Sequence, residues 1–175
     1  MENKITIMQG DLTLLEVDAI VNAANKTLLG GGGVDGAIHR AAGPSLLEEC
    51  RTLGGCETGQ AKLTDGYDLP ANKVIHTVGP VWNGGDRNEP ELLASCYQTS
   101  LELAKLGNLR TIAFPAISCG VYRFPFEDAC RIAIRETLQF LQGHPDALDH
   151  VTFCCFDESA TRKYHEAWTE ISSAK

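Results

Sequence analysis

The sequence contains no long hydrophobic run, and no stretch approaches the roughly 18 consecutive apolar residues that a membrane span requires. Its first residues, Met1 to Ile5, lack the pattern of a secretory signal peptide. The seven cysteines are an odd number and none lies in a Cys-x-x-Cys motif, which argues against a disulfide framework and against a zinc site. These absences favour a cytoplasmic protein without a membrane segment.

Positive charge is also scarce. The chain has 15 Lys and Arg residues against 23 Asp and Glu residues, a formal charge of −8, and its longest basic run is Arg162-Lys163. A protein that binds nucleic acid by neutralising phosphates needs a basic face, so direct nucleic-acid binding is not expected. If the chain binds phosphate, backbone N–H groups and helix ends must provide most of the contacts.

The length and composition predict a single domain over residues 1–175. Hydrophobic residues make up 43% of the chain, and a chain of this size can bury about 70% of its unfolded surface around one core. No internal repeat, low-complexity segment or linker divides it.

The hydrophobic pattern predicts strands that alternate with helices. Strands are expected at 4–9, 19–24, 61–64, 74–78, 111–114 and 151–156, and helices are expected to begin near residues 34, 44, 90, 125 and 159. This order implies an α/β protein with three αβα layers. Because the first two strands have no helix between them, the central sheet is expected to be mixed.

The most distinctive stretch is the run Gly30 to Gly33, which is followed by a helix start and Asp35. Backbone without Cβ atoms can approach a ligand closely, and its N–H groups can converge on a phosphate. The spacing Gly31-x-Gly33-x-x-Gly36 matches the dinucleotide fingerprint of nicotinamide-dependent oxidoreductases, but the preceding strand ends too early, at Ala24. From the residues alone, a flexible turn and an acid favoured by the helix dipole remain alternatives.

Two further loops follow predicted strands, at 115–122 and at 156–157. Ligands of open α/β sheets bind at the carboxyl ends of strands, so these loops are expected to lie beside the glycine run. Cys119 is a candidate nucleophile, but the sequence identifies no paired base, and a bystander thiol is the alternative. His39 and His76 lack partners at ligand spacing and are interpreted as core or surface histidines, and no metal site is expected.

Six stretches together carry a resemblance to a known family: 9–13 (QGDLT), 17–25 (VDAIVNAAN), 30–43, 76–80 (HTVGP), 114–118 (FPAIS) and 120–122 (GVY). In this order they resemble the macrodomains, and within them the bacterial O-acetyl-ADP-ribose deacetylases related to the MacroD type. The resemblance covers nearly the whole chain and implies a macrodomain fold with an ADP-ribose cleft.

The resemblance also implies roles for individual residues. Asp11 and the backbone of Leu12 would contact the adenine, and Phe156 would stack on it. Asn25 would hold the distal ribose, and Tyr122 would pack over that ribose. Backbone N–H groups from two sides would bind the diphosphate: those of Gly33 and Val34 on one side, and those of Ser118, Cys119, Gly120 and Val121 on the other.

The implied activity is hydrolysis of O-acetyl-ADP-ribose to ADP-ribose and acetate without a metal or cofactor. Asp35 and Asn25 are the expected catalytic residues, because ester hydrolysis needs a positioned water and a group that takes its proton. The same site is expected to release ADP-ribose from acidic side chains of ADP-ribosylated proteins. A non-catalytic ADP-ribose reader is the alternative function.

Two positions depart from the family pattern, and one partner is suggested by the family alone. Cys119 stands where Thr is more common, and Arg123 stands where Gly is usual. A backbone contact would tolerate the first change, whereas Arg123 is expected to narrow the distal-ribose end or to add charge near the phosphates. Ribonuclease III is a partner by resemblance only, and no residue of this chain points to such an interface.

Overall fold

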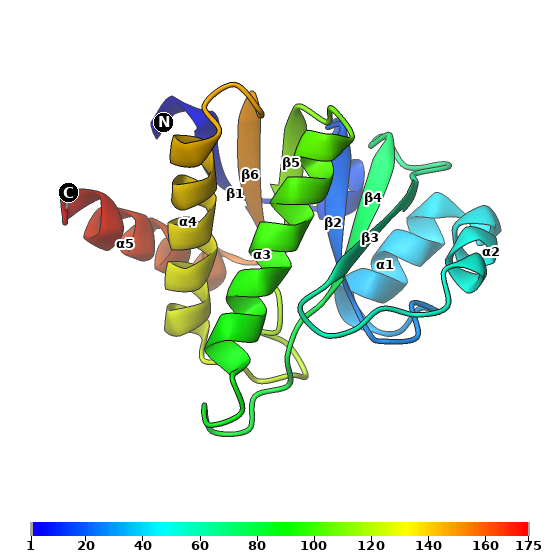
Figure 1. Ribbon diagram of the computed structural model, residues 1–175, viewed down its shortest axis with the longest axis horizontal. Coiled ribbons are helices and arrows are strands. Elements are labelled where there is room, and N and C mark those ends of the chain that lie inside the picture. Colours follow the sequence, from blue (N-terminus) through cyan, green and yellow to red (C-terminus); the bar gives the residue numbers. More distant parts are fainter. Residues whose placement is uncertain (1, 175) are drawn as a thin grey trace.

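The computed structural model describes residues 2–174 and shows a six-stranded sheet between two layers of helices (Figure 1). The strands are β1 (Ile5–Gln9), β2 (Ala19–Ala24), β3 (Ala61–Asp65), β4 (Lys73–Val78), β5 (Thr111–Phe114) and β6 (His150–Cys155). The helices are α1 (Gly33–Ala42), α2 (Pro44–Thr52), α3 (Glu89–Leu106), α4 (Phe126–Gly143) and α5 (Glu158–Ser173). The predicted α/β fold class and element order are confirmed, while two 3-10 helices, Glu2–Lys4 and Leu12–Leu14, were not predicted.

The sheet is mixed, as predicted, but for a different reason. Its strand order is β1-β6-β5-β2-β4-β3, so β1 and β2 are not neighbours. Both pair in parallel with the strands beside them, and the antiparallel strand is β3, which pairs with β4. The expectation that the first two strands cause the mixed character was therefore wrong, because the chain passes from edge strand β1 to interior strand β2, between β5 and β4, instead of forming a hairpin.

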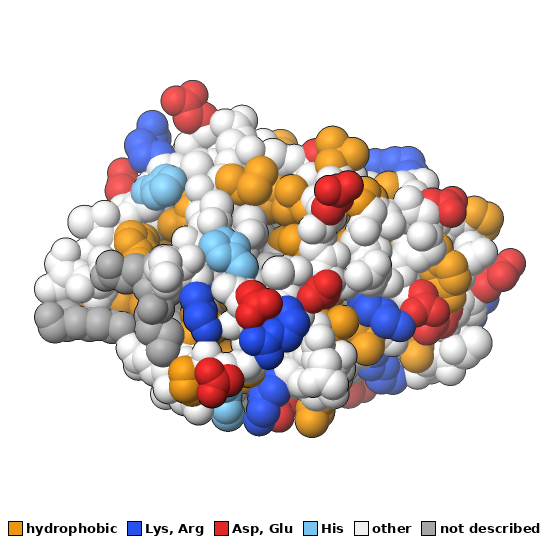
Figure 2. Space-filling model, turned by 90° about the horizontal axis from the view of Figure 1, so that it is seen from above, with side chains coloured by type: hydrophobic (Ala, Val, Ile, Leu, Met, Phe, Trp, Pro, Cys, Tyr) orange, Lys and Arg blue, Asp and Glu red, His pale blue; other side chains and the backbone are white. Residues whose placement is uncertain are grey.

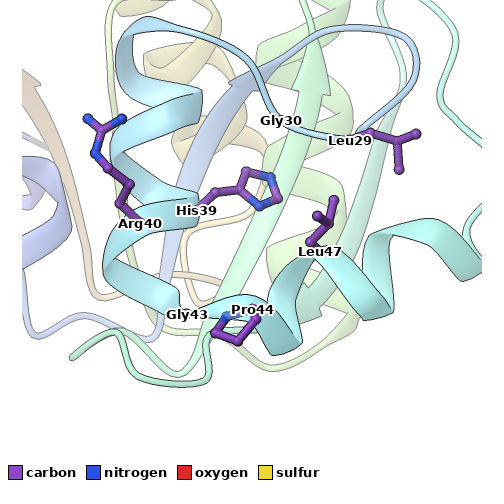
Figure 3. A pocket seen from close by; sticks show the side chains of 7 residues that line it. All are labelled: Leu29, Gly30, His39, Arg40, Gly43, Pro44 and Leu47. Atoms are coloured by element: carbon purple, nitrogen blue, oxygen red, sulfur yellow. The ribbon is translucent and has the colours of Figure 1, made fainter.

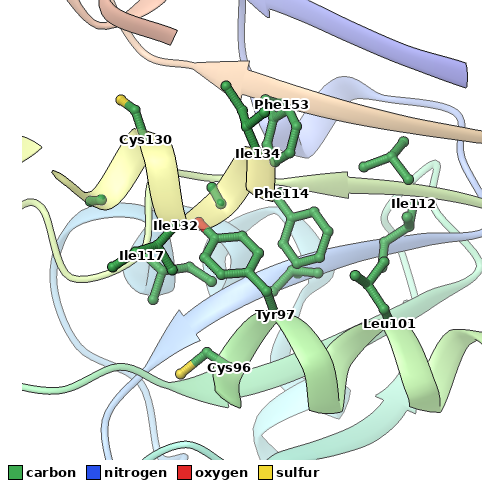
Figure 4. Packing of buried hydrophobic residues seen from close by; sticks show 14 of the residues in the cluster. Cys96, Tyr97, Leu101, Ile112, Phe114, Ile117, Cys130, Ile132, Ile134 and Phe153 are labelled. Carbon is green, nitrogen blue, oxygen red and sulfur yellow. The ribbon is translucent and has the colours of Figure 1, made fainter. Parts of the chain in front are cut away.

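The larger hydrophobic cluster lies between the sheet and α3, α4 and α5. Its centre is a row of buried aromatic rings that includes Tyr97, Phe114 and Phe153 (Figure 4). Between ring centroids, Tyr97 lies 4.9 Å from Phe114, and Phe153 lies 5.4 Å from Tyr164. Alternate residues of each strand point to this face, as the pleat of a strand requires. The parallel strands are thereby held in a rigid frame.

A second cluster on the opposite face joins the sheet to α1 and α2. Gly43 ends α1 and precedes α2 with φ +86°, a conformation that glycine adopts without strain. Pro44 then occupies the first turn of α2, where a backbone N–H is not needed. This tight junction packs α2 against α1, and α1 in turn packs against β2.

The face at the amino ends of the parallel strands carries acidic and basic side chains intermixed (Figure 2). One of its ion pairs joins Arg110 to Asp149 at 2.8 Å. Within residues 2–174, no helix has the length and apolar character needed to cross a membrane.

Candidate active site

The strand order places the predicted binding residues side by side. β1, β6, β5 and β2 are adjacent and parallel, so their carboxyl ends meet at one edge of the sheet, the lower edge in Figure 1. Along this edge follow Asp11, then Phe156, then the segment 115–124, called here the second loop, and then the segment 25–32, called the first loop. The four segments therefore form a row along this edge.

The β1 and β6 end of the row exposes an aromatic ring beside a carboxylate. Phe156 is 86% exposed, and the Gly10 N–H donates to the Cys155 carbonyl at 2.9 Å, which joins the two segments. Asp11 Oδ1 accepts from the backbone N–H and the hydroxyl of Thr13, at 2.9 and 2.7 Å. Its other oxygen, Oδ2, accepts from no described residue, so it is available to a ligand.

The middle of the row presents unpaired backbone donors. In the second loop, the N–H groups of Ser118 to Tyr122 donate to no other described residue. Gly33, Val34 and Asp35, which follow the adjacent parallel strand β2, form the first turn of α1, whose N–H groups have no acceptor within the helix. Because backbone N–H groups are normally paired, two rows of unpaired donors that follow adjacent strands indicate a site for an anion.

Asn25 braces the first loop with its side chain. Its Nδ2 donates to the Gly30 carbonyl at 3.0 Å, and its Oδ1 accepts from the backbone N–H and the hydroxyl of Thr27, at 3.1 and 2.6 Å. Asn25 is therefore a turn residue as well as a candidate ligand contact, and one hydrogen of Nδ2 is left for a ligand.

Asp35 is 5% exposed and lies in the first turn of α1. Its Oδ1 accepts from Asn22 Nδ2 at 2.9 Å and lies 3.4 Å from His39 Nε2. A Cβ at Gly31 would lie 3.2 Å from Asp35 Oδ2 and 3.4 Å from Asn25 Nδ2. The missing side chain of Gly31 thus leaves room for the polar atoms of the two predicted catalytic residues.

Buried polar residues behind Asp35 were not predicted as part of the site. Asn22 Nδ2 lies 3.1 Å from His76 Nδ1, and His76 Nε2 lies 2.9 Å from Thr64 Oγ1. Burial lowers the pKa of His76 to about 3, so the ring is neutral at pH 7. His76 is a core residue, as interpreted, but it is linked to Asp35, while His39 contacts Asp35 directly.

The structure does not favour a Cys119 nucleophile. Burial raises the pKa of the Cys119 thiol to about 12, so the group is protonated at neutral pH. Its sulfur lies 3.4 Å from the Ile117 carbonyl, and no histidine among the described residues is bonded to it. A backbone contact of Cys119 with a ligand is compatible with this environment.

The distal end of the second loop holds Tyr122 and Arg123. Tyr122 is half-buried and its carbonyl accepts from the Trp82 N–H at 2.8 Å, while Val121 is 90% exposed. Arg123 has φ +62°, in the left-handed region. This conformation explains why glycine is usual at that position, since a Cβ is strained there.

A shallow hollow of about 310 Å³ lies on the outer side of the first loop (Figure 3). It adjoins α1 and α2, and the His39 ring points into it from α1. The hollow shares only Leu29, Gly30 and His39 with the site described above, and its lining comprises Leu29, Gly30, His39, Arg40, Gly43, Pro44 and Leu47.

A family model described as "Macro domain" matches residues 21–133, which is more than half of the chain. The chain belongs to the macro domain family.

This macro domain has close relatives over nearly its whole length. It is 57% identical over 169 residues to a macro domain-containing protein of Methanosarcina mazei, covering 97% of this chain and 90% of that protein. It is 53% identical over 174 residues to the ADP-ribose glycohydrolase MACROD2 of Homo sapiens, covering 99% of this chain and 41% of that protein. A Trypanosoma brucei macrodomain in complex with ADP-ribose aligns with a TM-score of 0.90 at 50% identity, covering 94% of this chain and 69% of the other.

The residues that sequence reasoning missed in this macro domain had detectable signals. Asn22 is a polar residue within the otherwise apolar strand β2, and its direct partner in the register of β2 and β4 is His76. His39 follows Asp35 by four residues, the spacing that places two side chains on one helix face. Recognising the first signal required knowing which strands pair, whereas the second can be read from the helix spacing alone.

Proposed function

We propose that this macro domain hydrolyses O-acetyl-ADP-ribose to ADP-ribose and acetate. The observation that carries the proposal is the pair of unpaired N–H rows, with Asp35 and Asn25 at one end. Two relatives support it by their names: one is called an ADP-ribose glycohydrolase, and another was solved with ADP-ribose. The same ester chemistry would release ADP-ribose from acidic side chains of ADP-ribosylated proteins.

In the proposed complex the ligand lies along the row of strand ends. The adenine amino group donates to Asp11 Oδ2, the base contacts the backbone of Leu12, and Phe156 stacks on its face. The N–H groups of the second loop and of the first turn of α1 bind the diphosphate from opposite sides. The distal ribose then lies against Asn25, with Tyr122 over it.

The proposed reaction needs a water and one carboxylate. Asp35 Oδ2 has no donor among the described residues, and the space at Gly31 adjoins both this oxygen and Asn25 Nδ2, which supports a role for Asp35 in accepting a proton from water. The resulting hydroxide attacks the acyl carbonyl and forms a tetrahedral intermediate. This intermediate expels the ribose oxygen, Asp35 returns the proton to it, and acetate and ADP-ribose are released.

The test is to measure acetate release and ADP-ribose affinity for wild type, Asp35→Asn and Asn25→Ala after treatment with a chelator. We expect Asp35→Asn to lower kcat by about 10² to 10⁴-fold, the range for loss of a general base, and to leave the Kd for ADP-ribose nearly unchanged. A wild type that binds ADP-ribose and releases no acetate would be a reader. A wild type that does not bind ADP-ribose would refute the site itself.

Two coarser proposals accompany this function. We propose that residues 1–175 act as one domain, which is supported by the single sheet that spans both hydrophobic clusters. We also propose a cytoplasmic location, because all seven cysteines are free thiols.

A further inference from the structure

A chain of buried hydrogen bonds runs from Asp35 across β2 and β4 to β3. We propose that His76 and Thr64 are positioning residues for Asp35 and act through the Asn22 amide. This inference rests on the proposed hydrolysis. It assigns a role to two residues that lie outside the ligand site and that the reaction itself does not use.

The chemistry of the groups fixes the direction of each hydrogen bond. A carboxylate only accepts, so the atom of Asn22 that lies 2.9 Å from Asp35 Oδ1 must be the donor, Nδ2. The second hydrogen of Nδ2 then points to His76 Nδ1 at 3.1 Å, which must accept. In a neutral ring the proton is therefore on Nε2, and it is donated to Thr64 Oγ1 at 2.9 Å. The Thr64 hydroxyl in turn donates to the Asp65 carbonyl at 3.1 Å.

Because these groups are buried, they have few alternative hydrogen-bond partners, so the order of donors and acceptors is fixed. Asn22 and His76 are fully buried, and Thr64 is 2% exposed. Nearby, only Cys50 Sγ, at 3.9 Å, offers His76 Nε2 another and weaker partner among the described residues. Asn22 Oδ1 is itself buried without a partner. The orientation of the amide therefore depends on the two bonds of Nδ2 and not on its oxygen.

Removing the Thr64 hydroxyl would disturb this order step by step. In Thr64→Val, His76 Nε2–H loses its acceptor, and the ring lowers its energy by moving the proton to Nδ1. Nδ1–H would then face Asn22 Nδ2, two donors in contact, so the amide would turn and present Oδ1. That oxygen would also face the Asp35 carboxylate and repel it from the position required for the reaction.

Kinetics of three variants test the proposal. We expect Thr64→Val to lower kcat on the order of tenfold to a hundredfold, because displacing a catalytic group by about 1 Å has such an effect. The Kd for ADP-ribose should change by less than about twofold, and Thr64→Ser, which keeps the hydroxyl, should restore kcat. Thr77→Val is the matched control, because it removes another fully buried hydroxyl, bonded to the Gln60 carbonyl at 2.8 Å, on the other face of β4.

Equal loss of kcat in Thr64→Val and Thr77→Val would show a general effect of destabilisation and would overturn the proposal. Full activity of Thr64→Val in an active wild type would also overturn it while leaving the proposed function intact. A wild type without hydrolysis would overturn the proposed function and the positioning role together.

The tautomer of His76 provides a readout that does not depend on activity. Nitrogen-15 NMR of the ligand-free wild type should show a ring with a bare Nδ1 and a protonated Nε2, which does not titrate between about pH 5 and 8. In Thr64→Val the signals should shift toward the Nδ1–H form. A wild-type ring protonated on Nδ1 would contradict the assigned hydrogen bonds and overturn the proposal.

Discussion

The first and second loops face the same expected ligand, but they are held in different ways. In the first loop a side chain, the Asn25 amide, bonds to Gly30 and Thr27, and a buried polar chain lies behind Asp35. In the second loop the bonds are made by the backbone, from Arg123 to Gly120 at 3.0 Å and from Phe124 to Ser118 at 2.9 Å. Side chains thus fix the proposed catalytic end, whereas the backbone shapes the proposed anion site.

The support of the second loop comes from a neighbouring segment. Trp82 donates its N–H to Tyr122, and its ring packs edge-on against Phe124 with centroids 4.9 Å apart. The segment that follows Trp82 wraps around the carboxylate of Glu89, which is 1% exposed and accepts from the N–H groups of Asn83, Gly85 and Arg87 at 2.7, 3.0 and 2.6 Å. A buried carboxylate therefore supports the second loop indirectly.

Among changes to the two loops and their supports, the largest effect is expected from Gly31→Ala, which would disturb the arrangement of the first loop. The added Cβ would crowd Asp35 Oδ2 at 3.2 Å and contact Asn25 Nδ2 at 3.4 Å, so kcat should fall by up to about a hundredfold while ADP-ribose still binds. Gly32→Ala is the control, because nothing lies within 4 Å of a Cβ there and φ is −90°. Steady-state hydrolysis measures kcat for the two variants, and similar kcat values would contradict this role of Gly31.

The next largest effect is expected from Glu89→Gln, which should weaken the support of the second loop and change ligand binding more than turnover. Glu89→Gln removes the charge that holds the neighbouring segment, so we expect the Kd for ADP-ribose to rise about threefold to thirtyfold with kcat nearly unchanged. Glu91→Gln, an exposed acid in the same helical turn, serves as control. Calorimetric titration measures the Kd of both variants, and steady-state hydrolysis measures their kcat. A fall in kcat without a change in Kd would refute this division between the loops.

A smaller effect is expected in the pH dependence of stability. Burial alone would raise the pKa of Glu89, but the backbone donors of Asn83, Gly85 and Arg87 outweigh it and lower the pKa to about 2, from a usual 4.5. The stabilisation by ionised Glu89 is therefore complete above about pH 4.5 and is lost as the pH falls toward 2. The Tm difference between wild type and Glu89→Gln should shrink over this range. A Tm difference that stays constant over this pH range would show that the Glu89 charge does not cause the stabilisation.

The smallest effect is expected from Arg123→Gly. Glycine relieves the left-handed backbone at φ +62°, a gain of roughly 1 kcal/mol, but it also increases the entropy of the unfolded chain by a similar amount. We expect the free energy of unfolding, measured by thermal denaturation, to change by less than about 1 kcal/mol. A loss of ADP-ribose affinity at unchanged Tm would instead mean that the Arg123 charge reaches the ligand.

The sequence predicted the elements well because they depend on local patterns. Glycine and proline mark the helix ends, as at Gly43-Pro44, and the apolar spacing in α3 and α4 identifies the faces that pack on the sheet. The loops that form the site followed from the rule that ligands bind at the carboxyl ends of strands. The roles of single residues came from the family resemblance.

Long-range arrangements could not be predicted in this way. The pairing of β1 with β6 joins opposite ends of the chain, and no local pattern encodes it. The bonds among Asn22, His76 and Thr64 depend on the register of three strands. Glu89 resembles an ordinary acid at a helix start, and its burial arises only when the segment before it folds over it.

The position of Asp35 in the first turn of α1 has a geometric consequence. Gly33 and Val34, the proposed phosphate donors, belong to the same turn, so donors and carboxylate move as one rigid body. Their separation is set by the helix, at about 1.5 Å of rise per residue. In the proposed complex α1 therefore fixes the distance between the bound diphosphate and the ester bond. Substrates are selected by the length of the group, the distal ribose, that connects the two.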